Sequence, residues 1–125
     1  MIAVCLSAGA VTVTLFINSF TLAWMHSVEK IRWVEEWRIE GHTLHVIRAH
    51  IRGSGAGMEP PSDAIFRDGV WTYTPHVSSQ KNLTLIHSHF TKEYELCFDA
   101  QCYPLSQLVP ELSSFDTIVF EACER

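Results

Sequence analysis

The sequence predicts an all-β fold, an antiparallel β-barrel or sandwich of about ten short strands with at most one short helix. Short runs rich in β-branched and aromatic residues recur along the chain, and Gly, Pro, Asn and Asp separate them. No segment has an apolar stripe of helical period, apart from a short turn in "PLSQLV" at 104–109. Such spacing is typical of sandwiches and barrels. The chain of 125 residues is expected to form a single domain, 1–125.

The first 25 residues carry no charge, so a signal peptide or a membrane span must be considered. Val11, Val13 and Leu15 alternate with threonines, as in a half-buried strand, and there is no basic segment at the start. We therefore expect two strands around a turn at Asn18-Ser19 and no membrane span. The missing signal indicates the cytoplasm, and the periplasm is the alternative.

The other predicted strands follow in order. A hairpin turns at Gly41-His42, a strand follows Asp68-Gly69, and irregular structure is expected in the glycine- and proline-rich stretch at 53–63. The predicted strand segments are "WVEEWRIE" (33–40), "TLHVIRAHIR" (43–52), "GVWTYTP" (69–75), "NLTLIHSHF" (82–90) and "DTIVFEAC" (116–123).

Composition excludes some partners. Hydrophobic residues make up 47% of the chain and charged residues 18%, and the formal charge is −5. That charge argues against nucleic acid, and the scattered basic residues form no run that would hold an anionic membrane. No motif for a cofactor is present: "GSGAG" is neither a nucleophile elbow nor a dinucleotide loop.

The four cysteines have no zinc or redox spacing. If Asp99-Ala100 is a two-residue turn, Cys97 lies opposite Cys102, within reach of a disulfide. Two reduced cysteines packed as small apolar residues are the alternative. The other two cysteines lie near the two ends of the chain, so they meet only if the first and last strands pair.

The central hairpin can be given a register. With Gly41-His42 as a two-residue loop, Trp37 pairs with Val46, Glu35 with Arg48, and Trp33 with His50, all on one face. Glu35 and Arg48 would then form an ion pair between apolar residues. Such a pair either fixes the register or holds a polar ligand. A one-residue change in the length of the loop would reverse the faces.

His26 is the candidate catalytic base. It continues the apolar row of the preceding strand, where a histidine is more often structural than a metal ligand, and it has no second histidine at a close spacing. Ser27 cannot form a dyad with His26 by adjacency, because neighbouring strand side chains point apart. No metal site is therefore predicted.

Several segments together carry a family resemblance: "FTLAWMHSVEKIRWVEEWRIEG", "RGSGAGMEPP", "DGVWTY" and "YELCFDAQC". They are similar to the bacterial domain-of-unknown-function family 1850. The resemblance implies membership of an uncharacterised family, whose members are often encoded beside tripartite ATP-independent periplasmic (TRAP) transporters of the TAXI type. The family's motif positions fall on His26, Ser27, Val28, Glu29, Lys30, Glu35, Gly55, Ala56 and Gly57.

These observations predict a binding site at the corner between the His26 segment and the glycine loop. The first hypothesis is a non-catalytic accessory or small-polar-ligand-binding domain linked to solute transport, with a small polar molecule or a transporter component as partner. The second is a hydrolase with His26 as base and Glu35 orienting it, with or without a metal. The third is a purely structural or interaction role. The candidate ligand-binding residues are His26, Ser27, Glu29, Glu35, Arg48, Gly55 and Gly57.

Overall fold

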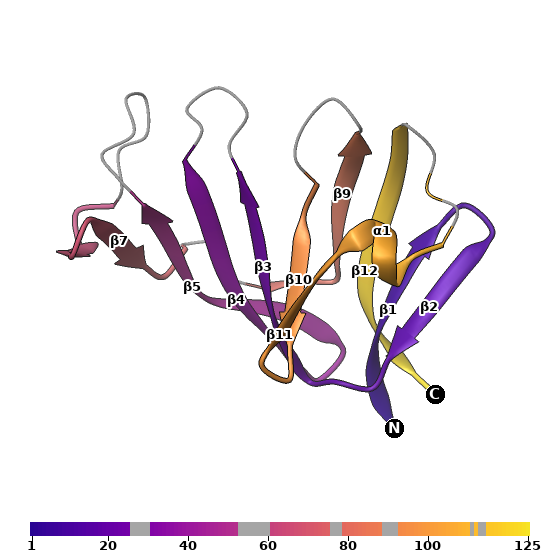
Figure 1. Ribbon diagram of the computed structural model, residues 1–125. Helices are drawn as coiled ribbons and strands as arrows, with labels where there is room; N and C mark the ends of the chain where they lie inside the picture. The colour runs from indigo at the N-terminus through magenta and orange to yellow at the C-terminus, as the bar shows by residue number, and fades with distance from the viewer. Residues whose placement is uncertain (26–30, 53–60, 76–78, 89–92, 111, 113–114) are drawn as a thin grey trace.

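The fold is a sandwich of two antiparallel sheets (Figure 1). It is seen in a computed structural model that describes residues 1–25, 31–52, 61–75, 79–88, 93–110, 112 and 115–125. The all-β prediction is confirmed, and the short helix α1 (Leu105–Leu108) falls in the predicted "PLSQLV" turn. Of the two predicted architectures the sandwich is correct, since the described strands form two separate sheets rather than a closed barrel.

The smaller sheet joins the two ends of the chain. The first strand, β1 (Ile2–Ala8), pairs with the last, β12 (Phe115–Glu124), which is the condition under which Cys5 and Cys123 could meet. The two cysteines form a disulfide with a Cα–Cα distance of 5.9 Å. The order is β2-β1-β12-β9. Its strands are β1 (Ile2–Ala8), β2 (Val11–Leu15), β9 (Asn82–Ser88) and β12 (Phe115–Glu124).

The larger sheet has eight strands in the order β11-β10-β3-β4-β5-β7-β6, with β8 also paired to β5. The two strands predicted around Asn18-Ser19 are present as β2 and β3, but they do not pair with each other. β2 belongs to the smaller sheet and β3 to the larger, so residues 16–18 cross between sheets. The strands are β3 (Ser19–Met25), β4 (Arg32–Glu40), β5 (Thr43–Arg52), β6 (Ile65–Arg67), β7 (Val70–Tyr73), β8 (Ser79–Gln80), β10 (Glu95–Phe98) and β11 (Gln101–Pro104).

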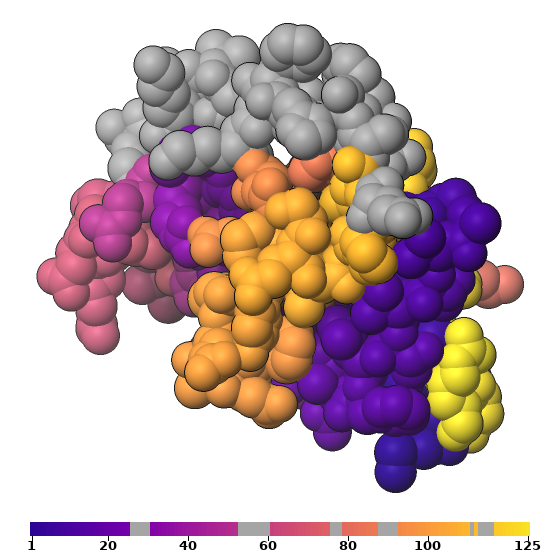
Figure 2. Space-filling view, turned by 45° about the vertical axis from the view of Figure 1, so that its right-hand side comes forward, coloured from indigo at the N-terminus to yellow at the C-terminus, as the bar shows by residue number. Residues whose placement is uncertain are grey.

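The hydrophobic core lies between the sheets and beneath α1. Alternating residues of each strand point into it, which is why the sequence shows period-two patterns. Figure 2 shows the segment from β10 to α1, in orange, on one face between the indigo N-terminal strands and β7. The buried core consists of Val4, Leu6, Ala8, Phe20, Leu22, Trp37, Leu44, Val46, Leu85, Leu96, Leu105, Val109, Ile118 and Phe120.

The β4–β5 hairpin confirms half of the predicted register. Gly41 has φ +62°, and the pairs from the turn to Trp37 opposite Val46 are as predicted. Beyond that point a β-bulge between Glu36 and Trp37 shifts the register by one residue. The predicted pairing of Glu35 with Arg48 is therefore wrong.

The shifted pairs are Glu35 with Ala49, Glu36 with Arg48, Val34 with His50 and Trp33 with Ile51. Because the bulge reverses the outer half of β5, apolar Ala49 and Ile51 turn inward and Arg48 and His50 turn outward.

The β10–β11 hairpin turns at Asp99 and Ala100, which both have positive φ. Cys97 lies opposite Cys102, and the two form a disulfide with a Cα–Cα distance of 4.0 Å. In the described part of the chain no helix is long and apolar enough to cross a membrane.

Candidate functional site

The predicted site residues are only partly brought together. Glu35 and Arg48 lie on opposite faces of the larger sheet, because of the bulge. Five of the predicted site residues lie outside the described residues: His26, Ser27, Glu29, Gly55 and Gly57. Three neighbouring strands, β3, β4 and β5, end next to those segments in the sequence, at Met25, Arg32 and Arg52. These three strand ends lie side by side in the sheet (Figure 1).

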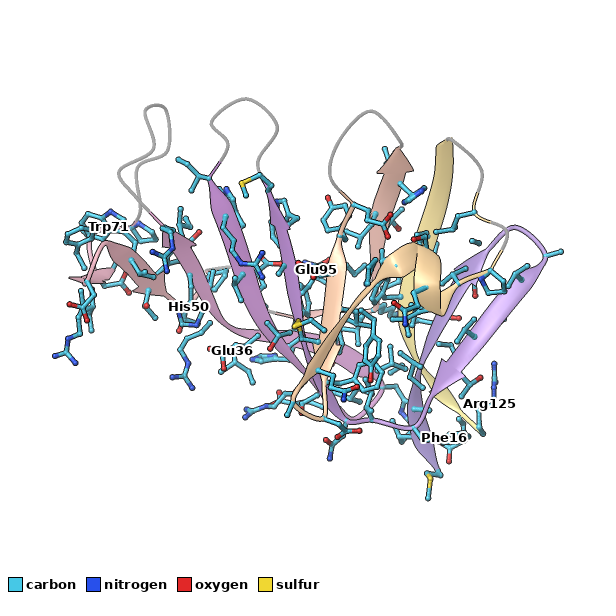
Figure 3. The ribbon with its side chains drawn as sticks, viewed as in Figure 1. Phe16, Glu36, His50, Trp71, Glu95 and Arg125 are labelled. Carbon is cyan, nitrogen blue, oxygen red and sulfur yellow. A yellow bond between two sulfur atoms is a disulfide. The ribbon has the colours of Figure 1, made fainter. Side chains whose placement is uncertain are left out.

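A row of aromatic side chains crosses the inner face of the larger sheet near these strand ends. The rings of Trp24 and Trp33 stack with centroids 5.7 Å apart, and Tyr94 adjoins Trp24 at 5.6 Å. The row continues through Ile51 to Trp71, which is labelled in Figure 3. A row of five aromatic residues from five segments gives a broad apolar surface with many ring faces: Tyr94, Trp24, Trp33, Trp71 and Phe66.

Glu35 occupies the next row of the same face. It pairs with Leu22 on one side and Ala49 on the other, and Tyr73 lies opposite Ala49. Its Oε1 accepts a hydrogen bond from Trp37 Nε1 at 3.2 Å. This places one carboxylate among aromatic and small apolar side chains, where charge is poorly solvated.

The pKa values reflect that environment. Burial raises the pKa of the Glu35 carboxyl above its ordinary value of 4.5, and the hydrogen bond from Trp37 offsets part of the effect. Burial, and then the charge of Glu35, raises the pKa of Tyr73 and of Tyr94. Two phenols thus lie close enough to Glu35 to be affected by its charge, one on each side of it.

This part of the inner face lies at the border of the core. Leu22 and Trp37 belong to the buried core, Trp24 and Tyr94 pack against it, and Glu35 is half-buried beside them. Figure 1 shows β5 and β7 at the far side of the sandwich from β1 and β2. A carboxylate with aromatic neighbours at the border of a core is a feature of binding sites.

The outer face of the same strands is polar. His50 Nε2 lies 2.6 Å from Glu36 Oε2, and His50 Nδ1 lies 3.0 Å from Thr72 Oγ1. Arg48 Nε is 3.8 Å from the same Glu36 oxygen. Figure 3 shows Glu36 and His50 side by side. These cross-strand pairs hold three strands in register and fix the orientation of the imidazole.

The described residues form two cavities that border this sheet. A groove of about 850 Å³ lies between the β2–β3 connection and the β10–β11 hairpin, with Glu36 and Ile47 among its lining residues. A smaller cavity of about 210 Å³ lies at the β4–β5–β7 edge. Neither is lined by Glu35.

His87 is the buried polar side chain of the described residues, at 2% exposure on β9 of the smaller sheet. Leu85 and His87 are two residues apart on β9, so their side chains point to the same, inner face of the sheet, which explains the burial of His87. In the described part of the chain no three His, Cys, Asp or Glu side chains are placed to hold a metal ion together.

Sequence reasoning selected Glu35 but missed its neighbours. Tyr73 and Tyr94 lie in segments that carry the family resemblance, but only the pairing of β7 with β5 and of β10 with β3 brings them to Glu35. Strand parity placed Trp33, Glu35 and Trp37 on one face correctly. Strand parity does not give the order of the strands in the sheet, and that order determines which residues lie side by side across it.

The fold and this site define a class: a small all-β sandwich with an aromatic-lined carboxylate on one face of its larger sheet. Among known families, residues 20–105 match the domain of unknown function described as DUF1850, and the chain belongs to this family. The match covers β3 to the start of α1, which includes Glu35 and all of the aromatic row. No curated protein and no solved structure matches the chain.

Proposed function

We propose that this protein is a non-catalytic accessory domain that binds a small polar ligand on the inner face of its larger sheet. Glu35 carries the proposal. A carboxylate kept partly buried beside Tyr73 and Tyr94 is a cost to folding, and a cationic or amino group would offset that cost on binding.

The aromatic row supports the same ligand class. Ring faces attract cations, and Trp and Tyr are the strongest of these surfaces. Trp24, Trp33 and Tyr94 lie one row from Glu35, so a single small molecule could contact both the carboxylate and the rings. The proposed ligand is a small organic molecule with an amino group, such as an amino acid or a short amine.

A thermal-shift screen with amino acids and short amines tests this proposal. The matched variants are Glu35→Gln and Glu36→Gln, which make the same change at adjacent positions on opposite faces. A ligand at about 100 times its Kd stabilises the fold by about 2.7 kcal/mol. We expect the shift in the wild type and in Glu36→Gln, and its loss in Glu35→Gln. An equal shift in both variants, or none across the panel, contradicts the proposal.

We propose further that the domain acts with a solute transporter and outside the cytoplasm. The transport link is supported by the family resemblance and its association with TAXI-type TRAP transporters. The compartment is supported by the two disulfides, Cys5–Cys123 and Cys97–Cys102, because such bonds persist in oxidising environments. Intact mass with and without reductant, on protein isolated from each compartment, tests the second point. Uptake measured in a deletion strain tests the first, since unchanged uptake contradicts it.

A further inference from the structure

Arginines are concentrated on one surface of an otherwise acidic protein. The chain has a formal charge of −5, yet five of its six arginines belong to strands of the larger sheet and face outward by register. Three of them have a carboxylate partner on that face, and Arg52 and Arg67 have none among the described residues. The five residues are Arg32, Arg38, Arg48, Arg52 and Arg67.

Arg32 and Arg52 stand opposite each other on neighbouring strands. On β4 Arg32 comes directly before Trp33, and on β5 Arg52 comes directly after Ile51. Because Trp33 pairs with Ile51 in this antiparallel hairpin, the two arginines are the next residues to face each other. Like charges opposite each other destabilise a sheet. The partner of Arg32 is the exposed Glu95 at 3.5 Å, a contact that contributes little. The two guanidinium groups therefore have donors available for another anion.

A cavity lies at this pair of arginines. It has a volume of about 210 Å³ and is lined by Arg32, Val34, His50, Arg52 and Val70. The two valines give it an apolar wall, while the two arginines give it positive charge. The imidazole of His50 is held in place from both sides, by Glu36 and by Thr72.

We propose that this cavity binds a short organic carboxylate, with the carboxylate between the guanidinium groups of Arg32 and Arg52 and the hydrocarbon part against Val34 and Val70. This site is distinct from the proposed Glu35 site, since it lies on the opposite face of the same sheet. The planar fork of Arg matches a carboxylate, which can accept two parallel hydrogen bonds. At the ~30 Å³ of liquid volume per water molecule, the cavity has space for about seven non-hydrogen atoms.

An NMR chemical-shift titration with acetate, propionate and butyrate tests this inference. We expect saturable shifts at residues of β4, β5 and β7, with affinity rising about three- to fourfold for each added methylene. Butyramide, which has the same shape without the charge, is expected to bind at least about tenfold more weakly than butyrate.

Two variants locate the site. Arg52→Gln is expected to weaken butyrate binding by about tenfold or more, since it removes charge-assisted hydrogen bonds. Arg67→Gln is the matched control, because it removes an equal charge from the same face without lining the cavity. Its effect is expected to stay below about twofold. Arg52→Gln should also keep its melting temperature, since it relieves a like-charge pair.

Several results would overturn the inference: equal losses in the two arginine variants, equal binding of butyramide, tighter binding of phosphate than of butyrate, or no saturable shift. Glu35→Gln separates this inference from the proposed function. Butyrate should bind that variant as it binds the wild type, whereas amine binding at the inner face should be lost.

Discussion

Glu35 and Glu36 are adjacent residues on β4, but the two carboxylates face opposite sides of the larger sheet. Glu36 lies in a solvated network with His50 and Arg48. Glu35 lies among apolar and aromatic side chains, with Trp37 Nε1 as its hydrogen-bond donor. The comparison shows that burial, more than residue type or local sequence, separates a structural carboxylate from a candidate ligand-binding one.

The two faces also differ in how they contribute to stability. The inner face stabilises the fold by burying apolar area, about 25 cal/mol for each Å². The outer face contributes exposed ion pairs, which are individually worth about 1 kcal/mol or less. Mutations on the two faces should therefore change the free energy of unfolding by different amounts, and the mutations at Glu35 and Glu36 should change it in opposite directions.

Inserting one alanine between Arg48 and Ala49 is the strongest way to break this comparison. The insertion would turn His50 and Arg52 inward and Ala49 and Ile51 outward. We expect destabilisation of more than about 4 kcal/mol, or no folded protein, because buried charges would lack partners. Circular dichroism with urea unfolding measures it. Deletion of Ile47 is the control, because Ile47 is the extra residue of the bulge and without it Arg48 still pairs with Glu36 and Ala49 with Glu35. Equal stability of both variants would contradict the register described.

Trp37→Ala should give the next largest effect. Trp37 is 2% exposed and stacks on Phe20 with ring centroids 6.2 Å apart. Truncation of such a ring costs about 3–5 kcal/mol, whereas Arg38→Ala on the outer face should cost less than about 1 kcal/mol. Urea unfolding of the two variants checks the difference. A loss below about 1 kcal/mol for Trp37→Ala would show that the ring is not packed as described.

The bulge also explains how far the sequence could predict the fold. Alternating residues and the two-residue turn at Gly41 were enough for the strands and for the register as far as Trp37 opposite Val46. The segment "HVIRAHIR" does not indicate an extra residue, because Ile47 is as compatible with a β-strand as its neighbours are. The pairing of Glu35 with Arg48 failed for that reason alone.

The candidate site was predictable in part. Glu35 was selected from strand parity and the motif, and the inward position of Trp33 followed from the same parity. The remaining neighbours depend on long-range pairing: Tyr94 reaches Glu35 because β10 pairs with β3, across more than seventy residues of sequence. The cavity at Arg32 and Arg52 depends on the shifted register and could not follow from the predicted one.

Glu36→Gln should cause a small loss of stability on the outer face. The change removes the charge that both His50 and Arg48 contact, at 2.6 and 3.8 Å. Because the side chains are partly exposed, we expect a loss of about 0.5–1 kcal/mol, which salt should reduce. Thermal unfolding at low and high ionic strength checks this. A loss that does not respond to salt would mean that packing, and not charge, is involved.

Glu35→Gln should have the smallest effect and the opposite sign. Burial raises the pKa of the Glu35 carboxyl in the folded state above its ordinary value of 4.5, so the folded protein holds this proton to a higher pH than the unfolded chain. The contribution of Glu35 to stability is then complete below about pH 4.5 and is lost as pH rises through the folded-state pKa. Glutamine has no proton to lose. We therefore expect Glu35→Gln to melt above the wild type at neutral pH, with the difference shrinking as pH falls toward 4.5. A variant that melts below the wild type at neutral pH would show that the Glu35 carboxylate is stabilised by its surroundings, and the basis for a ligand that compensates it would be lost.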